Sequence, residues 1–156
     1  MFGKKLSEYV RFQRWLLILL LVVWAVRLGA SLAGVPNEQT RWISLNLTLL
    51  AGLIYAAVAV HTSGFGSYKQ LLGLLLVQNF VSHMLIAVAI ILGIITGTDN
   101  IFTAPEYSGG GDGKTVLHVV AHGIAWILVA LVFWLIGSAI LFVTKKLAPR
   151  GARYSV

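Results

Sequence analysis

Four long apolar stretches constrain this chain more than any other feature of its sequence. They cover about residues 15–34, 42–61, 71–97 and 116–143. Each is long enough to cross the roughly 30 Å hydrocarbon core of a bilayer as a helix, which takes about 20 residues. They are apolar nearly all round, unlike the alternating segments of roughly ten residues in an outer-membrane barrel. With 58% hydrophobic and 11% charged residues, the chain is expected to be an integral membrane protein.

Short connections between these stretches predict the architecture. Segments 35–41, 61–70 and 98–115 join successive spans, and short links place consecutive helices antiparallel to one another. None of these segments is long enough to bury a core of its own. We therefore expect an all-α integral membrane protein in which residues 1–156 form a single domain, an up-down bundle of four transmembrane helices.

Basic residues gather at the span ends on one side of the predicted bundle. Only Arg41 and Lys114 belong to the other side, and Arg27 lies within a span. The positive-inside rule then predicts that both termini are cytoplasmic, in a bacterial inner membrane or another cytoplasmic membrane. The asymmetry also explains most of the net charge of +7 as contact with anionic headgroups, so no nucleic-acid partner is expected. The nine residues on the basic side are Lys4, Lys5, Arg11, Arg14, Lys69, Lys145, Lys146, Arg150 and Arg153.

Several local patterns predict packing and helix ends. Residues 4–14 are expected to form a short amphipathic helix on the inner leaflet. Residues 108–115 lack the first glycine of a phosphate-binding loop, and we interpret them as a flexible turn whose Thr115 caps the last span. Small residues four apart suggest close helix contacts. These are Gly29/Ala33 and Ala30/Gly34 in the first span, Gly52/Ala56 in the second, and Ala89/Gly93/Gly97 in the third.

Polar side chains inside the spans are the candidates for function, because such groups need partners in hydrocarbon. If each span is centred in the membrane, His83 lies near the midplane, and Asn46 and His122 lie about 9 and 11 Å outward. His118 is then about 17 Å outward. The polar residues are Arg27, Asn46, Gln78, Asn79, Ser82, His83, His118 and His122. A pocket in the outer half of the bundle is expected to be lined by Arg27, Asn46, His83 and His122.

Histidine chemistry leaves several alternatives open. The candidate metal ligands are His83, His118 and His122, although no cysteine or intramembrane carboxylate is present to complete a site. A haem b would take one imidazole from each of two helices, and His83 with His122 is the best pair. Their estimated depths differ by about 10 Å, which argues against that pairing. Structural hydrogen bonding and proton transfer are the other interpretations.

Taken together, these residues favour a small integral subunit of a larger membrane assembly, of an electron-transfer type. A haem b or a quinone would bind in the outer half, with Arg27 balancing a propionate or polarising a quinone carbonyl. Expected partners are the lipid bilayer and other membrane subunits or further copies of the chain. The alternative is a small proton-coupled carrier, but no proline, aspartate or glutamate lies within a span. An enzyme is not favoured, because no nucleophile–base pair or paired carboxylates are evident.

Overall fold

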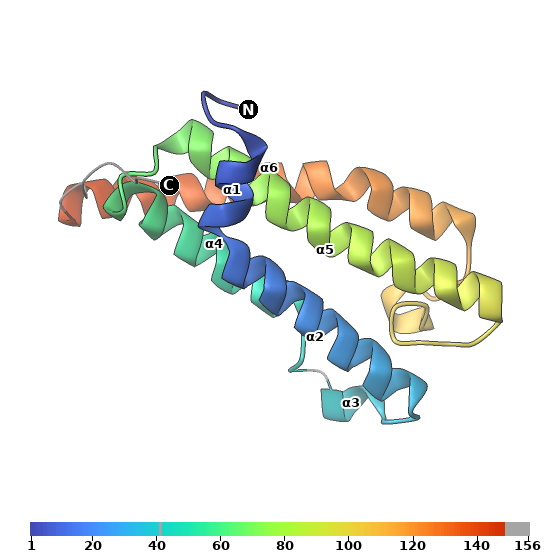
Figure 1. The fold of residues 1–156 in the computed structure, drawn as a ribbon. Helices are drawn as coiled ribbons and strands as arrows, with labels where there is room; N and C mark the ends of the chain where they lie inside the picture. The colour runs from blue at the N-terminus through green and yellow to red at the C-terminus, as the bar shows by residue number, and fades with distance from the viewer. Residues whose placement is uncertain (41, 149–156) are drawn as a thin grey trace.

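The structure, a computed structural model, describes residues 1–40 and 42–148. Regular secondary structure within these residues is entirely helical. Three short helices, α1 (Leu6–Phe12), α3 (Asn37–Thr40) and the 3-10 helix η1 (Pro105–Tyr107), lie at the ends of a bundle of long helices (Figure 1). The long helices are α2 (Arg14–Leu32), α4 (Leu45–Thr62), α5 (Tyr68–Thr96) and α6 (Val116–Leu147).

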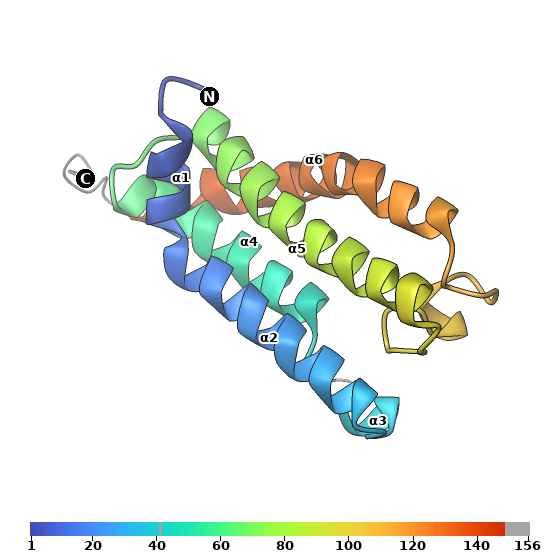
Figure 2. The same cartoon turned by 45° about the vertical axis from the view of Figure 1, so that its right-hand side comes forward.

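The four long helices correspond to the four predicted spans. Each is long and apolar enough to cross a membrane, which confirms an all-α fold and indicates an integral membrane protein. Successive long helices run in opposite directions and pack together, and α5 makes its most extensive contacts with α6 (Figure 2).

Capping explains where the longest helices begin and end. Helix α5 starts before the predicted apolar stretch, because Gln70 Oε1 accepts the Ser67 N–H at 3.0 Å and closes a capping box. It ends at Gly97, whose φ of 70° is the left-handed conformation that glycine adopts easily. The predicted Thr115 cap is confirmed, since its hydroxyl oxygen accepts the His118 N–H at 3.2 Å.

One end of the bundle, which we call the basic end, brings together α1, the α4–α5 connection and the C-terminal part of α6 (Figure 1). Lys145 Nζ donates to Ser67 Oγ at 2.7 Å across this end. The opposite end, which we call the loop end, carries α3 and residues 97–115. Of the predicted basic residues, Arg41, Arg150 and Arg153 lie outside the described residues.

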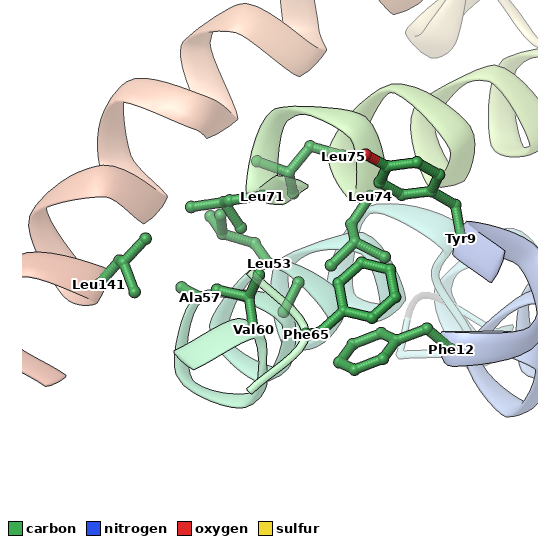
Figure 3. Close-up of a cluster of buried hydrophobic side chains, with 11 residues drawn as sticks. Tyr9, Phe12, Leu53, Ala57, Val60, Phe65, Leu71, Leu74, Leu75 and Leu141 are labelled. Carbon is green, nitrogen blue, oxygen red and sulfur yellow. The ribbon is translucent and has the colours of Figure 1, made fainter. Parts of the chain in front are cut away.

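Helix α1 packs into the bundle at the basic end. Its Tyr9 and Phe12 are buried among leucines of α4, α5 and α6 (Figure 3). The Tyr9 ring meets Phe65 edge to face, with centroids 5.5 Å apart. A side chain at Gly73 would clash with the Tyr9 ring, so glycine at that position lets α1 approach α5. The predicted helix is therefore present, with Tyr9 and Phe12 packed against protein and Leu6 and Val10 exposed.

Small residues mark one predicted helix contact, at Gly52, whereas Gly93 packs against Asn100 and Thr103 of the 97–115 segment. Gly52 and Gly93 are buried, and a Cβ at Gly52 would lie 2.6 Å from atoms of α2 and α5. The prediction for Gly29 is wrong for the described residues, because a Cβ there would meet no atom within 4 Å. A contact that the spacing did not predict lies at Gly137, where a Cβ would be 2.8 Å from Leu53.

Candidate functional site

A cavity of about 380 Å³ lies among the long helices toward the loop end. We call it the loop-end cavity. All four long helices contribute polar side chains to its wall, and apolar side chains complete the lining. The polar residues are Arg27 from α2, Ser44 just before α4, Asn46 from α4, Ser82 and His83 from α5, and His118 and His122 from α6. The structure thus brings the predicted pocket residues and all three candidate metal ligands to one cavity, whereas Gln78 and Asn79 do not line it.

His83 and His122 contact each other directly in this cavity. Their Nδ1 atoms are 3.0 Å apart and their ring centroids are 5.0 Å apart. A hydrogen bond between these nitrogens requires one Nδ1 to donate and the other to accept. The two imidazoles therefore share a proton position, and moving that proton exchanges their roles.

The contact corrects the depths estimated from the sequence. That estimate centred both spans at one level and separated His83 from His122 by about 10 Å. In the structure α6 is displaced along its axis, and Trp134 Nε1 donates to Tyr68 O at 2.9 Å, at the start of α5. The residues of α6 after Trp134 therefore extend past the start of α5. The residues before Trp134 are shifted along α5 by the same amount, and this shift brings His122 beside His83.

His118 extends this pair toward the loop. Its ring centroid is 5.1 Å from that of His122, and its Nδ1 lies 3.0 Å from the carbonyl oxygen of Gly113. A carbonyl oxygen can only accept, so this Nδ1 carries the hydrogen. The three imidazoles form a row from α5 to the end of the 97–115 segment.

Arg27 and Asn46 differ in burial. Arg27 is 7% exposed, and its Nη1 donates to the carbonyl oxygen of Ile43 at 3.1 Å, just before α4. It therefore turns inward, as predicted. Asn46 lines the cavity, as predicted, but is exposed. The reason is that α4 begins only at Leu45, so Asn46 lies in its first turn at the cavity mouth.

The segment 97–115 covers the cavity and is held by hydrogen bonds. Its buried Ile101 and Phe102 line the cavity. The Ile101 N–H donates to Ser31 Oγ of α2 at 2.8 Å, and Asn100 Nδ2 donates to the Ala89 carbonyl of α5 at 3.0 Å. The predicted flexible turn is thus part of a segment packed against two helices.

A hydrogen bond and an ion pair, both at the surface, also hold the 97–115 segment in place. Asn37 Nδ2 of α3 donates to Glu106 Oε1 at 3.1 Å, and Lys114 pairs with Asp99. The hydrogen bond that Lys114 donates to the Asp99 carboxylate raises the pKa of Lys114. Sequence reasoning did not select these residues, because nothing in a polar connection shows which of its side chains fold back.

Neither a metal site of three or more ligands nor an iron held between the two Nδ1 atoms fits the histidines as they stand. Among residues 1–40 and 42–148, no group of three or more His, Asp or Glu side chains is arranged to hold a metal ion. Two imidazole nitrogens on opposite faces of one iron would be about 4 Å apart, since each metal–nitrogen bond is about 2 Å long. The Nδ1 atoms of His83 and His122 are only 3.0 Å apart, so they leave no space between them for an iron that both would ligate.

No protein-family model, curated protein or solved structure matches this chain. The function therefore has to be inferred from the cavity and its lining.

Proposed function

We propose that this chain is a small integral membrane subunit that binds a quinone headgroup in the loop-end cavity, beside His83 and His122. The cavity volume of about 380 Å³ lies at the lower end of the range for small-molecule pockets, about 300–1,000 Å³. Ile86, Ile101 and Phe102 give it an apolar wall against which a planar ring can pack.

Hydrogen-bond donors on the polar wall suit the two carbonyl oxygens of a quinone. Arg27 has five N–H groups and the imidazoles offer ring N–H groups, all of which donate to carbonyl oxygens. The observation that carries the proposal is the His83–His122 hydrogen bond beside a buried arginine. Reduction of a quinone consumes electrons and protons. The imidazole pair would pass the protons, and a redox-active partner subunit would supply the electrons.

A proton-coupled carrier is the weaker proposal. The same imidazole pair could move protons for it, but α5 and α6 pass the cavity without interruption. Carriers commonly bind substrate where membrane helices are broken.

We also infer that the basic end faces the cytoplasm, with both termini there and the loop-end cavity in the outer half of a bacterial inner or other cytoplasmic membrane. Seven of the predicted basic residues lie at this end within the described part of the chain. At the loop end Lys114 is neutralised by Asp99. The positive-inside rule supports this orientation.

The direct test is to extract the purified protein with organic solvent and quantify bound quinone. We expect one quinone per chain, and His122→Phe should weaken its binding by about 2- to 10-fold, because a hydrogen bond to a neutral carbonyl contributes about 0.5–1.5 kcal/mol. His61→Phe is the matched control, since His61 bonds to the Ala148 carbonyl at the basic end.

Two results would contradict the proposal. One is a wild type that carries no quinone and takes none up on titration. The other is a Soret band in the reduced-minus-oxidised spectrum that His83→Ala removes, because this would show that His83 binds a haem.

A further inference from the structure

A line of buried polar atoms runs along α5 from the loop-end cavity toward the basic end. Both amide atoms of Gln78 and the hydroxyl of Ser82 have no hydrogen-bond partner among the described residues, and both side chains are 0% exposed. Polar groups buried in this way are almost always satisfied, by protein or by ordered water. Two adjacent unsatisfied residues therefore point to a ligand that both of them bind.

The line continues to the start of α2. Gln13 is 2% exposed, its Nε2 donates to the Leu74 carbonyl at 3.2 Å, and its Oε1 has no partner among the described residues. Leu74, Gln78 and Ser82 are successively four apart, so they lie on one face of α5 with a rise of about 6 Å between neighbours.

A second cavity, of about 370 Å³, lies where this line begins. It is lined by Gln13, Leu16 and Gly52 among others, and we call it the basic-end cavity. A Cβ on Gly52 would lie 2.6 Å from Gln78 Oε1. The Gln78 amide therefore lies directly behind Gly52 at the wall of the basic-end cavity, and one turn along the helix Ser82 lines the loop-end cavity.

We propose that Gln13, Gln78 and Ser82 hold a chain of ordered water that links the basic-end cavity to His83 and His122 and serves as their proton path. Amide and hydroxyl groups both donate and accept, so they match the two to four hydrogen bonds that a buried water makes. Each water accepts one proton from the side of Gln13 and gives up another to the next water. For every proton that enters the water chain, one proton is therefore delivered to the accepting imidazole nitrogen.

The proton role rests on the proposed function, because it supplies the protons that a quinone in the loop-end cavity would consume. The water chain itself does not depend on the quinone. The two parts can therefore be tested separately.

Water contact can be measured by solid-state NMR on the full chain in bilayers without quinone. With ¹⁵N-glutamine, the side-chain amides to be resolved belong to Gln13, Gln39, Gln70 and Gln78. We expect magnetisation from water to reach the Gln78 amide about as fast as that of the exposed Gln39, with the Gln78 signal assigned by its loss in Gln78→Leu. No transfer to Gln78 would overturn the water chain.

Proton delivery can be measured in proteoliposomes that contain quinone, with a chemical reductant as electron source and a pH dye as readout. Gln78→Leu and Gln13→Leu should bind quinone as the wild type does, because neither residue lines the loop-end cavity, but take up protons at least tenfold more slowly. Ser138→Ala is the matched control, because this hydroxyl is also buried without a partner among the described residues but belongs to neither cavity lining.

Each outcome decides one part. Unchanged proton uptake in both variants would overturn the proton role. A wild type that binds no quinone would overturn the proposed function and the proton role with it, while the NMR result would still decide the water chain.

Discussion

Among single residues, Gly113 fixes the position of His118 at the cavity mouth. Its carbonyl accepts from His118 Nδ1, and a side chain on it would clash with the backbone carbonyl of Thr103, which cannot rotate away. Gly113→Ala should therefore force the 97–115 segment apart and lower the free energy of unfolding by about 1–3 kcal/mol. Thermal unfolding in detergent measures this loss.

The matched control is Gly111→Ala, because a Cβ at this exposed loop glycine would meet no atom within 4 Å. Its effect should stay within about 0.5 kcal/mol, as for most surface substitutions. Equal melting temperatures for the two variants would show that the Gly113–Thr103 contact does not hold the loop.

Which site residues come together could be predicted because an unpartnered polar group is costly in hydrocarbon. That rule selected Arg27, His83 and His122 from the sequence. It could not give their separation, since the axial position of α6 depends on packing at Gly137 and on the Trp134–Tyr68 hydrogen bond. Those contacts join residues far apart in the sequence, and no local pattern expresses them.

Among the helices, α1 is the element whose attachment depends most on one side chain. Tyr9 is 0% exposed, packs on Phe65 and Gly73, and donates from its hydroxyl to the Met1 carbonyl at 3.0 Å. Burial raises the pKa of Tyr9, so the hydroxyl stays neutral and able to donate beyond its ordinary range.

Tyr9→Ala should destabilise the protein by about 3–5 kcal/mol, the usual cost of removing a buried aromatic ring. It should also release α1 and expose it to protease. Thermal unfolding and limited proteolysis of the first residues measure these effects. Val10→Ala is the control, since Val10 is 41% exposed on the same helix. Equal protease sensitivity of the two variants would contradict the attachment of α1 through Tyr9.

The long helices were predictable because length and hydropathy set them, whereas their ends depend on caps. The polar first turn of α5 was missed, since Ser67 and Gln70 cap it without adding hydrophobicity. The fold of residues 97–115 was missed for a related reason. Its hydrogen bonds run to Ser31 and Ala89, whose availability depends on the assembled bundle.

In the molecule as a whole, α5 is the central helix. Its span is 56% buried, against 17% for α2 and 22% for α6, although all have similar hydropathy. Average hydropathy therefore does not identify the centre of the bundle. The central helix is identified instead by its polar residues, because protein encloses them there. These buried residues of α5 are Gln78, Asn79, Ser82 and His83. Both cavities and the proposed water chain are arranged around this helix.

The orientation of the bundle decides which side of the membrane each cavity faces. The chain has no cysteine, so a single substitution provides a unique thiol. Gly111→Cys places it at the loop end, in open space, and Ser7→Cys places it on the exposed side of α1 at the basic end. In intact spheroplasts a membrane-impermeant maleimide should label Gly111→Cys at once. It should label Ser7→Cys only after the membrane is permeabilised, because the basic residues hold that end in the cytoplasm. The opposite labelling pattern would turn the loop-end cavity toward the cytoplasm, and the proposed water chain would then draw protons from the outer side.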